Sequence, residues 1–230
     1  MASELKEFSH FDQGTPLWFE ARCGIVTASM IGNLITAKTL KPADNETSRG
    51  VIETLVTERL TGRVEHIVEN RDMQRGTLSE PYARDVYAEH YKMNIKEVGF
   101  YRRDEDGWRL GYSPDGVVGE DGLIEIKSPK AKNHLRTILN DEVPAMYVPQ
   151  VQTGLYVTGR EWIDFVSYNA GMPLYVKRVE PDERWHEAIA ATVAAVESQV
   201  EAITSRYLEA VEGRPKTEYV DVFGEDLEVW

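Results

Sequence analysis

Residues 113–127 read SPDGVVGEDGLIEIK and set the pattern of the central part of the chain. Between residues 123 and 127, Ile124 and Ile126 alternate with Glu125 and Lys127. This is the two-residue period of a β-strand, so Glu125 and Lys127 share one face. The GEDG segment at residues 119–122 is typical of a turn that folds this strand back on the preceding one. The stretch therefore predicts a β-hairpin with a charged face.

The length of the turn decides whether a second acidic residue joins that face. With a three-residue connection, Val118 pairs with Gly122, and Asp115 lies opposite Glu125; a two-residue connection puts Asp115 on the other face. Directly opposed side chains on one face have Cβ atoms about 4.5–5.5 Å apart. Two carboxylates at this distance repel each other unless a cation lies between them or one takes up a proton. Oxygen ligands favour Mg²⁺ or Mn²⁺ over zinc.

The alternative is a solvated strand face with an ordinary Glu–Lys pair, and Glu125 and Lys127 alone favour that interpretation. Adding Asp115 at hairpin distance favours a metal site instead. A divalent ion there polarises a phosphodiester and activates a bound water. Lys127 is then placed to orient that water or to neutralise charge developing on phosphate. The residues predict Asp115, Glu125 and Lys127 as catalytic, with Asp115 and Glu125 binding metal.

Composition describes a folded protein of one domain over residues 1–230, with 42% hydrophobic and 10% aromatic residues. Its one cysteine, Cys23, excludes a disulfide framework and a multi-cysteine zinc site. The start lacks the apolar run of a signal peptide, and no uninterrupted apolar stretch approaches the roughly 20 residues of a membrane span. We therefore expect a cytoplasmic protein without a membrane partner.

The net charge of −13 argues against general binding of nucleic acid, because binders of polyanions usually carry the opposite sign. DNA responds to the local field, however, and the charges are unevenly spread. Acidic residues crowd a C-terminal segment at about 217–230. Lys130, Lys132 and Arg136 follow the predicted site in a basic loop, where we expect contacts with the DNA backbone. His134 in the same loop is interpreted as a phosphate contact or as having no role.

Periodicity predicts helices before and after a run of strands. The helices are expected at residues 27–36, 46–60, 77–91, 149–156 and 182–211, and the strands at 98–101, 108–113, 123–127, 162–168 and 174–179. The helix at 77–91 is expected to begin with a capping box formed by Thr77 and Glu80. The order of elements predicts an α/β (α+β) fold with a central mixed sheet flanked by helices.

Three motifs in this order carry a resemblance to a known family. Pro114-Asp115 followed by Glu125-Ile126-Lys127 resembles the signature of the PD-(D/E)xK nucleases, whose core is restriction-endonuclease-like. The longer stretches 111–116 (GYSPDG) and 123–129 (LIEIKSP) resemble the active-site motif of the phage lambda-type exonucleases. The segments 18–29 (WFEARCGIVTAS) and 148–152 (VPQVQ) resemble the motifs before and after the active-site strand in the phage lambda-type exonucleases, the viral recombinase branch. The resemblance covers roughly residues 14–179.

The resemblance implies a 5′→3′ exonuclease that degrades one strand of linear double-stranded DNA processively from a 5′-phosphorylated end. It implies Mg²⁺ as cofactor with Mn²⁺ as a substitute, two ions in the site, a homotrimer ring and a single-strand annealing protein as partner. By resemblance the Ile126 backbone carbonyl and Glu80 join the metal ligands. Gln152 orients Lys127 or the water, and Arg22 and Ser29 bind the terminal phosphate.

Two alternatives remain open at this point. A structure-selective or site-specific endonuclease of the same chemical class would cut without needing a free end. A non-catalytic interaction protein with an acidic, DNA-mimicking surface would suit the net charge but not the Asp, Glu and Lys set.

Overall fold

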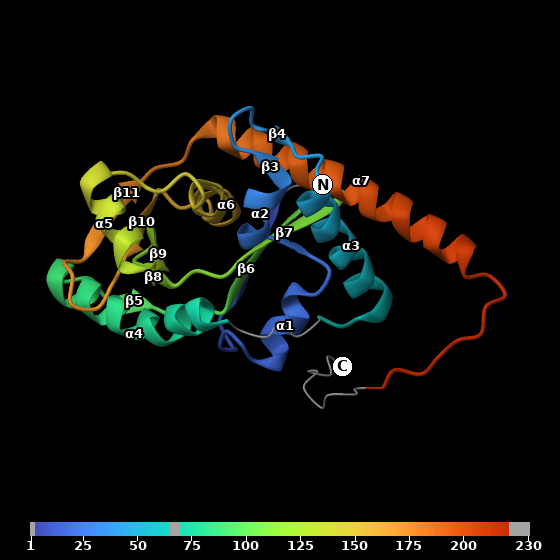
Figure 1. The fold of residues 1–230 in the computed structure, drawn as a ribbon, viewed down its shortest axis with the longest axis horizontal. Helices are drawn as coiled ribbons and strands as arrows, with labels where there is room; N and C mark the ends of the chain where they lie inside the picture. The colour runs from blue at the N-terminus through green and yellow to red at the C-terminus, as the bar shows by residue number, and fades with distance from the viewer. Residues whose placement is uncertain (1–2, 65–69, 221–230) are drawn as a thin grey trace.

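The computed structural model describes residues 3–64 and 70–220 of the chain (Figure 1). The helices are α1 (Pro16–Arg22), α2 (Ala28–Leu34), α3 (Glu46–Thr61), α4 (Arg71–Tyr91), α5 (Ala131–Asn140), α6 (Val148–Thr158) and α7 (Glu183–Ala210). One sheet has the strand order β1 (Glu4–Phe8), β6 (Phe100–Glu105), β7 (Trp108–Tyr112) and β2 (Val26–Thr27). A second sheet has the order β11 (Tyr175–Val179), β10 (Trp162–Ser167), β9 (Gly122–Lys127), β8 (Gly116–Val118) and β5 (Ile95–Lys96). Strands β3 (Ile35–Thr36) and β4 (Lys41–Pro42) form a short separate pair.

The strands on either side of residues 113–115 belong to different sheets. β7 pairs with β6 and β2, whereas β8 pairs with β9 and β5. Pro114 lies in this connection and has no amide hydrogen to offer to a strand ladder. The mixed α/β class is confirmed, but the predicted single central sheet is divided in two. Each of the two sheets contains one parallel pair, β2–β7 and β9–β10.

Several helix ends follow from local chemistry, as expected. The Asn45 side chain caps α3 in a reciprocal capping box with Ser48, and Gly62 ends the helix in the left-handed region at φ 68°. Gly159 ends α6 in the same way, at φ 68°. The Asp182 carboxylate accepts the Arg184 amide hydrogen at the start of α7.

The start of α4 differs from the prediction. The helix begins at Arg71, where the Asn70 side chain accepts amide hydrogens from Asp72 and Met73. Thr77 lies inside the helix, and its hydroxyl donates to the carbonyl of Met73. The capping box expected at Thr77 and Glu80 is therefore wrong, because its position is the helix interior, where the amides are already bonded along the helix.

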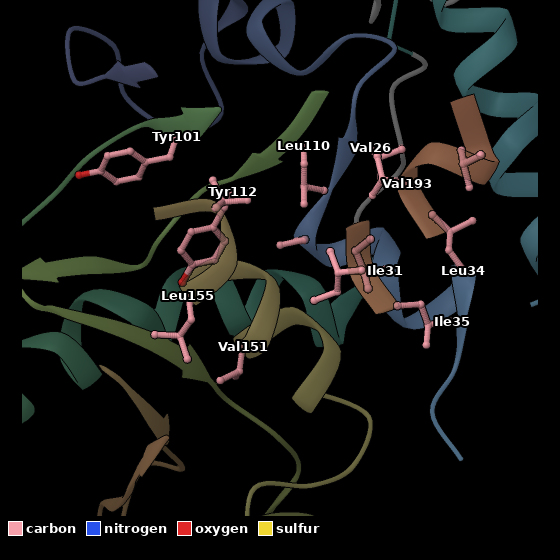
Figure 2. Close-up of a cluster of buried hydrophobic side chains, with 14 of the residues drawn as sticks. Val26, Ile31, Leu34, Ile35, Tyr101, Leu110, Tyr112, Val151, Leu155 and Val193 are labelled. Atoms are coloured by element: carbon pink, nitrogen blue, oxygen red, sulfur yellow. The ribbon is translucent and has the colours of Figure 1, made fainter. Parts of the chain in front are cut away.

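Helix α6 is buried and contacts strands of both large sheets. It contacts α2, α7, β6, β7 and β10, and residues around most of its circumference are buried. Figure 2 shows Val151 and Leu155 of this helix in the apolar cluster that also holds Ile31, Leu110 and Tyr112. Of the helices in residues 3–64 and 70–220, none has the length and apolar character needed to cross a bilayer.

Candidate active site

The β8–β9 hairpin brings the predicted acidic pair together. Its register pairs Val118 with Gly122 and Gly116 with Ile124, so three residues connect the strands. Gly119 opens the turn at φ 57°, a conformation that favours glycine. The next position in the register places Asp115 opposite Glu125. The Asp115 carboxylate accepts the amide hydrogen of Ile126 at 2.5 Å, so the hairpin geometry predicted for these residues is confirmed.

The Glu125 carboxylate is buried, with 1% of its side chain exposed, and three side chains donate to it. Its Oε1 atom accepts from Lys127 Nζ at 2.7 Å and from Gln150 Nε2 at 2.5 Å. Its Oε2 atom accepts from the Tyr112 hydroxyl at 2.9 Å. The Lys127 ammonium also lies 5.6 Å from the ring centroid of Tyr147.

Burial and mutual repulsion govern the charges of this cluster. Burial raises the pKa of Asp115 well above its usual range, and the carboxylates of Glu125 and Glu80 raise it further. Burial alone would lower the pKa of Lys127, but the carboxylates of Glu125 and Asp115 outweigh it and raise the pKa. The two carboxylates therefore favour the ammonium form of Lys127. Burial and the Glu125 carboxylate also raise the pKa of Tyr112 well above its usual range, so its hydroxyl keeps its proton.

Glu80 reaches the same cluster from α4. Burial and the Glu125 carboxylate raise the pKa of Glu80, against the opposing effect of the Arg84 guanidinium. Arg84 donates a hydrogen bond to the Glu80 carboxylate and a second to the carbonyl of Asp115, at 2.9 Å. Glu80 therefore interacts by charge with Asp115 and Glu125, and it forms an ion pair with Arg84 of the same helix.

The donors suit a hard divalent cation. Asp115 and Glu125 offer only oxygen. The pKa of Asp115 is raised first by burial and then by repulsion from Glu125 and Glu80, and a cation between the carboxylates would relieve that repulsion. Within the described part of the chain, no three His, Cys, Asp or Glu side chains converge in an arrangement able to hold an ion. Pairing of Glu80 with Arg84 accounts for the missing third carboxylate, so a site here rests on the acidic pair with the neighbouring backbone.

The helix after the site contributes a different glutamine from the one predicted. Gln152 is buried, donates to the carbonyl of Glu180 at 2.9 Å and accepts the Asp182 amide hydrogen at 2.9 Å. It tethers the start of α7 and does not face Lys127. Gln150 faces Glu125 instead, because side chains two residues apart on a helix point to nearly opposite sides. The motif VPQVQ contains Gln150 as well as Gln152. Their spacing of two residues on a helix shows that only one of them can face the site, but not which one.

Arg22 approaches the site through a residue that the sequence did not single out. Its guanidinium donates to the Ser113 hydroxyl at 3.1 Å and lies 4.0 Å from the ring centroid of Trp18. Burial lowers the pKa of Arg22 to about 10, with a smaller opposing effect from Glu58. Ser113 stands two residues before Asp115, so this contact joins α1 to the catalytic hairpin. Ser29 is exposed near the start of α2, and its hydroxyl lies 3.1 Å from that of Thr27.

The basic residues after the site divide into two groups. The predicted loop is mostly helix α5, on which Lys132 and Arg136 are exposed. Lys130 precedes this helix and forms a salt bridge with Asp72 at 2.9 Å. His134 is fully buried, where its ring nitrogens lie 2.8 Å from the Ser167 hydroxyl and 2.9 Å from the Pro173 carbonyl. A phosphate contact by His134 is therefore wrong: its role is to hold α5 against β10.

The fold and the site together define a nuclease of the PD-(D/E)xK class. Residues 17–161 match the YqaJ-like viral recombinase domain family. Because this match covers more than half of the chain, the chain belongs to that family, which consists of metal-dependent nucleases.

Solved structures agree with this membership. The crystal structure of LHK-Exo in complex with dAMP is 35% identical, with a TM-score of 0.76, and covers 86% of this chain and 98% of that one. The crystal structure of an alkaline exonuclease (LHK-Exo) from Laribacter hongkongensis is 34% identical, with a TM-score of 0.71, and covers 85% and 100%. A phage-related exonuclease from Haemophilus somnus 129PT shares the fold at 15% identity and a TM-score of 0.60, over 80% and 96%.

A curated relative is more distant. An uncharacterized protein of Acanthamoeba polyphaga mimivirus is 25% identical over 176 residues. The alignment covers 71% of this chain but 30% of that protein, so the chain spans less than a third of the relative's length.

Proposed function

We propose that this protein is a Mg²⁺-dependent 5′→3′ exonuclease that hydrolyses one strand of linear double-stranded DNA from 5′-phosphorylated ends. The observation that carries the proposal is the buried Glu125 carboxylate, held by Lys127 and placed in register with Asp115. A lone surface Glu–Lys pair would not be buried or bonded to three donors. The family membership supports nuclease chemistry for this cluster.

The residues divide the chemistry between them. Asp115, Glu125 and the Ile126 carbonyl would hold Mg²⁺, or Mn²⁺ in its place, and Glu80, now bonded to Arg84, would be the further ligand for a second ion. The bound metal supplies Lewis-acid activation of the phosphodiester and of a water. Lys127, fixed by Glu125, orients the attacking water and neutralises charge that develops on the phosphate oxygens.

The preference for a 5′-phosphate is assigned to the α1 side of the site. Arg22 has no carboxylate hydrogen-bonded to its guanidinium among the described contacts, and its planar fork suits two phosphate oxygens. Ser29, in the same N-terminal motif as Arg22, and Ser113, which is bonded to Arg22, offer hydroxyl groups to the same phosphate. The relative solved with dAMP supports a deoxynucleoside monophosphate as the product.

Exposed basic residues next to the site are proposed to bind more of the DNA. Lys130, Lys132 and Arg136 contact the DNA backbone beyond the scissile phosphate, and the net charge of −13 lies on surfaces that DNA does not meet. We further propose a processive homotrimer ring that makes 3′ overhangs for a single-strand annealing protein in the cytoplasm of a bacterial host. Sizing in solution tests the trimer.

The decisive experiment compares DNA ends. Linear duplex with 5′-phosphate is expected to be degraded in Mg²⁺, and covalently closed circles are expected to survive. Lys127→Ala and Asp115→Asn are expected to lose at least about 10²-fold in rate. Arg22→Ala is expected to reduce discrimination between phosphorylated and hydroxyl ends.

Each alternative has its own outcome in this assay. Efficient linearisation of closed circles would make the protein an endonuclease. If wild type is as inactive as Lys127→Ala, the hypothesis of a non-catalytic interaction protein with an acidic surface is favoured. Unchanged end discrimination in Arg22→Ala would remove Arg22 as the phosphate sensor.

A further inference from the structure

Tyr112 is the donor to Glu125 to which the sequence pattern assigned no role. It ends β7, in the sheet that does not carry the hairpin, and its side chain is fully buried. Figure 2 shows its ring within the apolar cluster, beside Leu155 of α6. Its hydroxyl nevertheless donates to Glu125 Oε2 at 2.9 Å, so it links the two sheets at the site.

The backbone of α6 makes room for this ring. A Cβ atom added at Gly154 would lie 2.7 Å from Cζ of Tyr112 and 2.9 Å from its Cε1. Glycine in a helix interior is unfavourable relative to alanine, so its presence here calls for a steric reason. The close approach of the Tyr112 ring supplies that reason. The small Gly154 lets the Tyr112 ring of β7 pack closely against α6, in the position from which its hydroxyl reaches the Glu125 carboxylate.

The distribution of donors on Glu125 gives the hydroxyl a specific task. Each carboxylate oxygen has two lone pairs, and those of Oε1 are both engaged by Lys127 and Gln150. Oε2 accepts only Tyr112 among the described hydrogen bonds, which leaves a lone pair for a cation. A donor on Oε2 therefore fixes the plane of the carboxylate and the direction of that lone pair.

We propose that Tyr112 is a positioning residue that orients the Glu125 carboxylate for metal binding. This proposal rests on the proposed function, since it assigns Glu125 to the metal. Groups that hold a metal ligand from behind typically change metal affinity or activity by about 10- to 100-fold when removed. Because its side chain is fully buried, Tyr112 acts through its bond to Glu125.

The test replaces the hydroxyl and keeps the ring. Tyr112→Phe is expected to weaken Mn²⁺ binding at least about tenfold, measured by calorimetry on the DNA-free protein. The Mg²⁺ concentration for half-maximal digestion is expected to rise in parallel, while DNA affinity measured in EDTA stays unchanged. Thermal unfolding of each variant confirms that it is folded under the conditions of the titration.

The chain offers a matched control directly across the sheet. Tyr101 pairs with Tyr112 in the β6–β7 register and is also buried, but its hydroxyl donates to Glu7 at 3.1 Å. Tyr101→Phe makes the same chemical change and is expected to leave Mn²⁺ binding unaltered. Gly154→Ala crowds the Tyr112 ring without removing a polar group and is expected to weaken Mn²⁺ binding as Tyr112→Phe does.

The outcomes separate this inference from the function beneath it. Mn²⁺ binding by Tyr112→Phe as tight as by wild type, or equal losses in Tyr101→Phe and Tyr112→Phe, would overturn the positioning role alone. Wild type that binds no Mn²⁺ would overturn the metal-dependent function and this role with it.

Discussion

The two glutamines of α6 allow a sharp test of which one serves the site. Gln150 donates to the buried Glu125 carboxylate at 2.5 Å. A hydrogen bond to a charged group contributes about 1.5–3 kcal/mol. At about 1.4 kcal/mol per factor of ten, Gln150→Ala is expected to lower kcat by roughly 10- to 150-fold if that bond holds Glu125 in its reactive position.

Gln152 is expected to behave in the opposite way. Its side chain bonds the Glu180 carbonyl and the Asp182 amide, both at 2.9 Å, where α7 begins. Glu180 is exposed, so water replaces part of what Gln152→Ala removes. The expected loss is about 1–3 kcal/mol in the free energy of unfolding, with kcat of the folded protein near that of wild type.

Two measurements separate these effects. Urea unfolding followed by circular dichroism gives the stability of each variant, and single-turnover digestion of 5′-phosphorylated duplex at saturating Mg²⁺ gives its rate. The reasoning is refuted if Gln152→Ala is fully stable but inactive while Gln150→Ala digests DNA like wild type.

Three further predictions follow from the charges and buried contacts. In metal-free protein, the contribution of Asp115 to the free energy of unfolding is expected to fall as pH rises from 3.8, its ordinary pKa, through its raised pKa, because the native state holds that proton more tightly. Asp115→Asn is therefore expected to lose less stability than wild type between pH 4 and 8 in urea unfolding; equal pH slopes of the two proteins would contradict it. Lys132→Ala and Arg136→Ala are each expected to weaken DNA binding and reduce the slope of log K against log salt by about 1, measured by fluorescence anisotropy. His134→Ala is expected to lower the free energy of unfolding by about 1–3 kcal/mol and leave that slope unchanged, whereas a reduced slope would return His134 to the DNA surface.

Local sequence predicted most of the longer elements and the hairpin of the site, but it placed helix α5 in a loop. The two-residue period at residues 123–127 predicted the strand and the face that Glu125 and Lys127 share, and the glycines predicted a turn of two or three residues, of which the structure has the three-residue one. Those features depend on contacts between near neighbours, where side-chain alternation and turn geometry leave few choices. The ends of α3 and α6 follow from Gly62 and Gly159 for the same reason.

The predicted start of α4 failed for a related physical reason. A Thr–Glu spacing at Thr77 suits a helix start only when the preceding turn is absent, and Asn70 had already begun the helix. The role of residues 217–230 stays a prediction, since 217–220 are exposed and 221–230 lie outside the described residues.

By itself the sequence determined the strand, the face shared by Glu125 and Lys127, and Asp115 as a candidate partner, because these lie within 13 residues and obey strand periodicity; the structure then fixed the turn that aligns Asp115. Tertiary structure decided what surrounds them. The break at Pro114 places Tyr112 in another sheet yet directs its hydroxyl to Glu125, and the packing of α6 chooses Gln150 over Gln152. These contacts join residues from separate elements, and only the packed core sets their distances and directions.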